Sequence, residues 1–113
     1  MEQHYKLYRV RELADGDEEF VATLAAAFLE EVPEDAERLK EAVANNDHYN
    51  AYQAAHKMKP TIDLFELGVL QDLIEVQDWG KFEKTDLDIS DRLTIVLAAV
   101  NNATEELKAD FNL

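Results

Sequence analysis

The chain has 113 residues, the length of one small domain, and 47% of them are hydrophobic, which excludes a disordered chain. The 25 acidic residues outnumber the 11 basic residues and give a formal net charge of −14, so binding of nucleic acid or anionic lipid through charge is not expected. The absence of cysteine excludes disulfides, thiolate zinc sites and thiol nucleophiles. We therefore expect a single domain over residues 1–113.

The beginning of the chain, Met1-Glu2-Gln3-His4-Tyr5-Lys6, lacks the basic and then apolar pattern of a signal peptide. No run of about 18 apolar residues is present, as a membrane-spanning helix would need. The sequence thus predicts a cytoplasmic protein.

The first half of the chain predicts a short helix over 5–14 and a longer helix after it. Asp15-Gly16-Asp17 predicts the turn between them, with Asp17 as the N-cap of the second helix. Pro33 ends that helix or begins the next, because proline fits the first turn of a helix and not its interior. The apolar stripe of the second helix is formed by Phe20, Val21, Leu24, Ala27, Phe28 and Val32.

The second half predicts three further helical segments. Asn45-Asn46-Asp47 predicts a turn that caps a helix with a buried stripe, and a segment from Val69 to Trp79 follows it. The polar stretch 80–88 predicts a loop, and Asp88 or Ser90 caps the last helix, which extends to Phe111. The buried stripe of the middle helix is expected to contain Ala51, Ala54, Ala55, Met58, Ile62 and Phe65. The sequence therefore predicts an all-α fold, an antiparallel four-helix bundle with an additional short N-terminal helix.

The segment around His56 contains the candidate nucleophile of the chain. At about 100° per residue, the core stripe lies roughly opposite His56, so its imidazole is expected to face solvent. Between Lys40 and Lys81 the only lysines or arginines are Lys57 and Lys59, and they flank His56 on opposite sides. In so acidic a chain they predict a local positive spot around an exposed imidazole, which is a competent nucleophile near neutral pH. A phosphoryl group on that ring would add negative charge for Lys59, one turn away, to pair with.

Pro60 is a second unusual feature of this segment. A proline inside a helix removes its own N–H bond, here to the carbonyl of His56. Its ring is compact, so a partner is expected to approach His56 closely.

The stretch Ala55-His56-Lys57-Met58-Lys59 resembles the A-H-x-L-K-G signature of histidine-containing phosphotransfer (HPt) domains. The resemblance covers roughly residues 5 to 110, because the segments before the histidine match the usual run in kind and order. These segments are Gly16–Phe20, Phe28–Pro33, Leu39 with Ala42, and Asn46-Asp47.

The resemblance implies a helical bundle that works in a phosphorelay of a two-component system. His56 would accept a phosphoryl group from an aspartate of a response-regulator receiver domain or from a hybrid histidine kinase, and pass it to another receiver. Lys59, with Lys57 as a further candidate, would stabilise the phosphoryl group. Mg²⁺ would belong to the receiver, so no cofactor and no metal site are expected in this chain. Because the partner shares the chemistry, no independent turnover is expected. No kinase core or receiver fits in 113 residues, so we expect a free-standing monomer, with a domain excised from a longer protein as the alternative.

Two positions depart from the family pattern. Pro60 and Thr61 stand where the family usually has Gly and Ser, and Glu66 stands where a glycine is usual, with Gly68 nearby. The second departure suggests a shifted helix end. Neither removes the nucleophile or the lysine, although both bear on the choice of partner.

A docking surface is expected beside the histidine. Tyr49 and Tyr52 either pack at the rim of the core or belong to this surface. Phe28, together with Leu29 and Val32, is expected to be partly exposed there. The residues assigned to docking are Phe28, Tyr52, Gln53, Pro60 and Asp63.

Other interpretations of the same residues stay open. His4 and His48 lack the context of His56 and are interpreted as surface residues, and a metal site of His48 and His56 would need more ligands than the sequence places nearby. The departures at Pro60 and Glu66 favour a binding module that docks a receiver or kinase without phosphotransfer. The net charge alone favours an acidic decoy for a basic nucleic-acid-binding surface.

Overall fold

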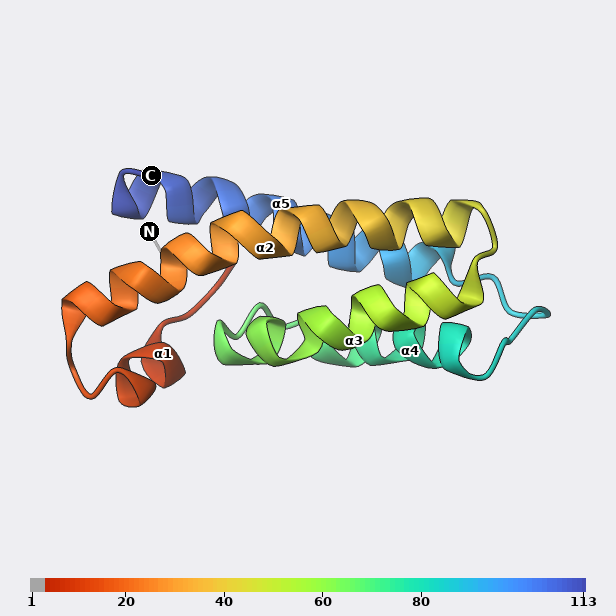
Figure 1. The fold of residues 1–113 in the computed structure, drawn as a ribbon, viewed down its shortest axis with the longest axis horizontal. Coiled ribbons are helices and arrows are strands. Elements are labelled where there is room, and N and C mark those ends of the chain that lie inside the picture. Colours follow the sequence, from red (N-terminus) through yellow and green to blue (C-terminus); the bar gives the residue numbers. More distant parts are fainter. Residues whose placement is uncertain (1–3) are drawn as a thin grey trace.

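All regular elements of the described chain are helices. The computed structural model describes residues 4–113, and no strand occurs among them, which confirms the all-α prediction. The helices are α1 (Tyr8–Leu13), α2 (Glu18–Ala44), α3 (His48–Leu64), α4 (Leu70–Lys81) and α5 (Ser90–Phe111) (Figure 1).

The four longer helices contact one another in a closed ring. Helix α2 packs against α3 and α5, and α4 packs against the same two helices. Each of these helices runs in the direction opposite to the one before it, and α1 lies beside the beginning of α2 (Figure 1). The buried apolar side chains of all five helices belong to one hydrophobic cluster, which extends along the 46 Å length of the molecule.

Helix α2 is continuous through Pro33, so the prediction that this proline ends one helix or begins another was wrong. Proline removes the backbone bond to the carbonyl of Leu29, which weakens a helix interior. On either side of it, however, Val32 and Ala36 are both buried in the same cluster. Burial of this shared apolar face holds both halves of α2 on the core and outweighs the missing hydrogen bond.

The predicted N-caps of α2 and α3 are confirmed. The carboxylate of Asp17 accepts hydrogen bonds from the backbone N–H groups of Glu19 and Phe20. The carboxylate of Asp47 accepts from the side chain and the backbone N–H of Asn50, and these bonds lower the pKa of Asp47. The predicted cap of α5 was wrong, because its N-cap is Ile89 and not Asp88 or Ser90. Asp88, just before the helix, instead accepts hydrogen bonds from the hydroxyl and backbone N–H of Ser90, which lowers its pKa in the same way.

The N-terminal helix is shorter than the predicted 5–14. Tyr5 and Leu7 precede α1, and both side chains are buried. Between them, the N–H of Lys6 donates to the carbonyl of Phe65 at 2.8 Å. The hydroxyl of Tyr5 donates to Asp110 of α5. This segment therefore gains more from burial of Tyr5 and Leu7 in the core than from another helical turn.

The predicted loop starting at Gly80 begins later, because α4 continues to Lys81. A Cβ atom at Gly80 would lie 2.5 Å from the carbonyl oxygen of His48 and 2.7 Å from the backbone nitrogen of Tyr52. Gly80 thus marks a close approach of α4 to the backbone of α3 rather than a chain break.

Candidate functional site

Helix α3 separates a buried face from the face that carries His56. The residues of the predicted stripe are buried, which confirms the orientation of this helix, and His56 is exposed as predicted. The buried residues are Ala51, Ala54, Ala55, Met58, Ile62 and, just after the helix, Phe65. Small alanines beside the core let α3 lie close to its neighbours, so His56 projects from a well-packed helix.

The ring of His56 is supported on one side and open on the other. The ring of Tyr52, one turn earlier, stacks against it with 5.7 Å between centroids and an interplanar angle of 29°. Neither ring nitrogen of His56 has a hydrogen-bond partner among residues 4–113. The stack restrains the imidazole while both nitrogens stay available to a partner.

Lys59 lies one turn after His56, and its ammonium group forms no ion pair within the described part of the chain. The carboxylate nearest to it in helical spacing is that of Asp63, at i+4. This carboxylate pairs instead with Arg9 of α1, with 2.8 Å from Nη1 to Oδ1. The same nitrogen donates to the Asp63 carbonyl, and the hydrogen bond to the Asp63 side chain raises the pKa of Arg9. Lys59 therefore keeps an unpaired positive charge near His56.

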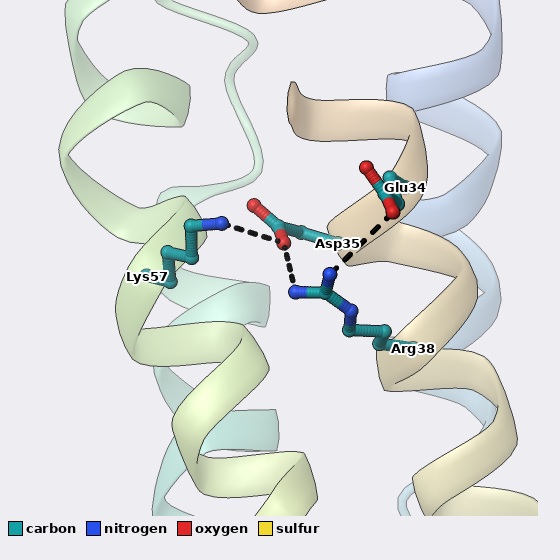
Figure 2. Close-up of polar contacts among 4 residues, drawn as sticks. All are labelled: Glu34, Asp35, Arg38 and Lys57. Carbon is teal, nitrogen blue, oxygen red and sulfur yellow. Dashed lines mark hydrogen bonds and ion pairs between the residues drawn. The ribbon is translucent and has the colours of Figure 1, made fainter. Parts of the chain in front are cut away.

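Lys57 has different surroundings from Lys59. Its Nζ lies 3.2 Å from Oδ1 of Asp35 in α2, and Nη1 of Arg38 lies 3.1 Å from the same oxygen (Figure 2). The predicted positive spot of two lysines is therefore changed, because the charge of Lys57 is directed to α2. Arg38 was missed by the sequence analysis, since nothing in the spacing of the chain brings it beside Lys57.

Four of the five predicted docking residues are at least partly exposed. Gln53 and Pro60 are exposed, and Tyr52 is half-buried beside His56. Asp63 is half-exposed, but its carboxylate is engaged by Arg9.

Phe28 was wrongly placed on the docking surface. Its side chain is only 1% exposed, and its ring centroid lies 4.9 Å from that of Phe65. Val32, expected to be partly exposed with it, is buried as well, whereas Leu29 is partly buried against the core. The continuous α2 turns this stripe towards the core.

The two tyrosines of α3 are not equivalent. Tyr49 is 69% exposed, which places it on the surface, while Tyr52 lies at the rim of the core. His48 is half-buried and its ring stacks on Trp79 with 4.1 Å between centroids, so the interpretation of His48 as a plain surface residue was wrong.

A groove of about 680 Å³ lies between α2 and α3 and reaches His56. Its lining contains the positive groups of Lys57 and Arg38 and also the carboxylates of Asp35 and Glu41. Because charges of both signs line it, the groove is not expected to bind a free anion in preference to a cation. His56 therefore lines the same groove as the ion-paired side chains of Asp35 and Arg38 from α2 and Lys57 from α3.

Two further observations bear on cofactors and membranes. Residues 4–113 contain no group of three or more His, Asp or Glu side chains that could hold a metal ion. None of the helices described is long and apolar enough to cross a membrane.

Comparisons with known proteins return no match: no family model matches the chain, and no curated protein or solved structure does so significantly. The likeness to HPt domains thus depends on the motif around His56 and on the segments before it that match the usual run of the family. Chemically, these residues offer an accessible imidazole with an unpaired lysine one turn away.

Proposed function

We propose that this protein is a phosphorelay intermediate of the HPt type, with His56 as its phosphoacceptor. The observation that carries the proposal is the exposed imidazole of His56, one turn before the ammonium group of Lys59 on α3, with neither group hydrogen-bonded or ion-paired to any other described side chain. Histidine near neutral pH keeps an unprotonated nitrogen that can act as a nucleophile. The partner that fits this chemistry is a receiver domain that carries an aspartyl phosphate.

The transfer is an in-line displacement at phosphorus. A ring nitrogen of His56 attacks the phosphorus atom, the bond from phosphorus to the aspartate oxygen breaks, and the aspartate leaves as a carboxylate. Lys59 pairs with the oxygens of the transferring group, whose negative charge it offsets. The reverse reaction passes the group to a second receiver, and Mg²⁺ belongs to the receivers.

We further propose that the helices form an antiparallel four-helix bundle that holds this site. The closed ring of contacts among α2, α3, α4 and α5 and their alternating directions support this arrangement. A rigid bundle suits the transfer, because a fixed imidazole lowers the entropy cost of alignment with the partner's phosphate.

The decisive experiment compares His56→Gln with the unchanged protein during incubation with a phosphorylated receiver. We expect the variant to accept no phosphoryl group, as followed by radiolabel transfer or intact mass at neutral pH. His4→Gln is the matched control, since it also removes an exposed imidazole but lies outside α3. Equal labelling of His56→Gln and wild type would disprove the assignment.

Lys59→Ala tests the second residue of the site. We expect transfer to slow about tenfold or more while the helical content is unchanged, because the lysine acts on charge that develops during transfer. Lys84→Ala removes an exposed lysine from the loop after α4 and serves as the control. An unchanged transfer rate in Lys59→Ala would remove this lysine from the mechanism.

A binding module without phosphotransfer is the second candidate. The observation that favours it is Pro60, whose exposed ring stands one turn from His56 where HPt domains usually have glycine. This function predicts a stable complex with a receiver or kinase and no phosphohistidine. Mass-spectrometric detection of phosphorylated His56 under neutral conditions would rule it out.

A further inference from the structure

Asp35 is a buried carboxylate close to the proposed site. Its side chain is only 4% exposed, although the other acidic groups around it on α2 face solvent. Figure 2 shows it between the side chains of Arg38, from its own helix, and Lys57, from α3. Oδ1 accepts from both, at 3.1 Å and 3.2 Å.

A carboxylate this buried needs a positive partner, because its loss of water is otherwise costly. Arg38 supplies one at i+3 within α2. Lys57 supplies the second from the neighbouring helix, and its side chain is 55% exposed. Asp35 therefore fixes the direction of a lysine that has ample room to move.

The direction matters because Lys57 is the residue next to His56. At helical spacing Lys57 and Lys59 leave α3 on opposite sides of the histidine. The Asp35 pair draws Lys57 towards α2, while Arg9 engages the Asp63 carboxylate that Lys59 would otherwise meet. Lys57 is thus held by Asp35 of α2, whereas the carboxylate nearest to Lys59 in helical spacing is held by Arg9.

We propose that Asp35 is a positioning residue that holds Lys57 in an ion pair with α2, so that Lys59 is the lysine that pairs with a phosphoryl group on this histidine. The inference rests on the proposed phosphoacceptor role of His56. It adds that the choice between the two lysines is decided by Asp35 on α2, which is not hydrogen-bonded to the histidine in the described part of the chain.

The test uses a small phosphoryl donor, potassium phosphoramidate, so that no receiver is required. A ring nitrogen of His56 attacks its phosphorus, the P–N bond breaks, and ammonia leaves. The second ionisation of the resulting phosphohistidine is then followed by ³¹P NMR against pH, in a His4→Gln background. Assignment of the signal is confirmed by its loss in His56→Gln. A nearby unpaired ammonium group favours the dianion and increases this ionisation constant.

Asp35→Asn should release Lys57 and increase the ionisation constant about two- to fivefold, the range expected for an exposed ion pair. The increase should disappear in Asp35→Asn/Lys57→Met and shrink at high salt. Glu34→Gln is the matched control, because it removes the same charge from the cluster, while within residues 4–113 Glu34 pairs only with Arg38, at 3.5 Å. Asp35→Glu should restore wild-type behaviour.

Three other variants keep the inference testable if Asp35→Asn does not fold. Lys59→Met should lower the ionisation constant by more than Lys57→Met does. Arg9→Met should also lower it, because it frees Asp63 to pair with Lys59. Equal effects of the two lysine variants, or equal behaviour of Asp35→Asn and Glu34→Gln, would overturn the inference.

The outcomes also separate this inference from the proposed function. If no receiver phosphorylates His56 but the lysine variants differ as described, the relay function fails and the positioning role stands. If receivers transfer to His56 while the two lysines act equally, the relay function stands and the positioning role fails.

Discussion

Phe28 lies at the point where α2 faces the end of α3, and its ring is tilted by 55° against that of Phe65. Full burial of both rings makes this contact a part of the core rather than of a partner surface. Phe28→Ala should therefore lower the free energy of unfolding by about 3–5 kcal/mol, measured by urea denaturation.

Phe28→Leu separates packing from docking. It keeps most of the buried volume and should cost less than Phe28→Ala, about 1.5 kcal/mol or below. If Phe28 has no docking role, the transfer rate of folded Phe28→Leu should equal that of the wild type. Slower transfer at unchanged stability would return Phe28 to the partner surface.

Lys57 and Lys59 show how much of a site depends on residues elsewhere in the chain. Their own spacing around His56 is a local property, so their positions on opposite sides could be predicted. Their partners could not be, since Asp35 is 22 residues from Lys57 and acts from another helix. Arg9, 54 residues before Asp63, is likewise invisible to helical spacing.

At the scale of helices, four of the five end in the same way. The residue two positions after α1, α2, α3 and α4 has a left-handed backbone, a conformation that glycine favours. These residues are Asp15, Asn46, Glu66 and Glu83, with φ of 53°, 53°, 51° and 47°. After α3, the N–H of Leu67 bonds the carbonyl of Ile62, which closes a Schellman turn.

Glu66→Gly should therefore stabilise the protein. The change relieves the left-handed strain of a residue with a Cβ and removes a buried carboxylate oxygen, Oε2, that has no partner among the described residues. We expect a gain of about 1 kcal/mol in urea unfolding, net of the larger chain entropy of glycine. Gly68→Ala, at φ +79°, is the control and should destabilise. A loss of stability in Glu66→Gly would show that this carboxylate does more than end the helix.

The position of Glu66 also bears on the resemblance to HPt domains. Helix α3 ends two residues before Glu66, which stands where the family usually has glycine, and the backbone of Glu66 has the conformation that glycine favours. No shift of the helix end is needed to account for the missing glycine. Glu66 thus differs from the family pattern in its side chain, while its backbone conformation is the one that glycine favours.

Gly80 determines how closely α4 approaches α3. Gly80→Ala would place a methyl group against backbone atoms of His48 and Tyr52, neither of which can rotate away. We expect a loss of about 1–3 kcal/mol in the free energy of unfolding, as for other overpacked contacts. Lys81→Ala, at an exposed position of the same helix, should change stability little. A neutral Gly80→Ala would mean that α4 can move outwards without cost.

Gly80→Ala should also change the surroundings of His56. Because Tyr52 stacks on His56, a displaced Tyr52 backbone should alter the ring-current shifts of the His56 protons in NMR spectra. Unchanged shifts would indicate that the close approach serves packing alone.

The existence of each helix could be predicted from apolar spacing, and the caps at Asp17 and Asp47 from their residue types. The sequence misplaced the boundaries at Pro33 and Gly80 for a common reason. Both residues usually interrupt helices, but here burial of α2 against the core and the close contact of α4 with α3 override that tendency. Such tertiary effects are not contained in the local pattern.

For the whole molecule the dominant property is its charge. A net charge of −14 is distributed over a shape of 46 × 22 × 20 Å, so carboxylates on opposite faces lie within about 20 Å of one another. The screening length is about 30 Å at 0.01 M ionic strength and about 8 Å at 0.15 M. At 0.01 M ionic strength the carboxylates on opposite faces therefore repel one another, and at 0.15 M this repulsion is screened.

We accordingly expect sodium chloride to stabilise the folded protein between 0.01 M and 0.15 M, as measured by the midpoint of thermal unfolding at neutral pH. The opposing term is screening of the ion pairs, which include Arg9 with Asp63 and Arg92 with Asp72 and Glu75. These pairs are exposed on their basic side and each contributes little, about 0–1 kcal/mol, so the self-repulsion of the acidic surface should dominate.

The matched control exchanges surface glutamates away from these pairs, such as Glu30 and Glu31, for glutamine, which should reduce the salt effect. A midpoint that falls as salt is added would show instead that the ion pairs between helices hold the fold more strongly than its net charge opposes it.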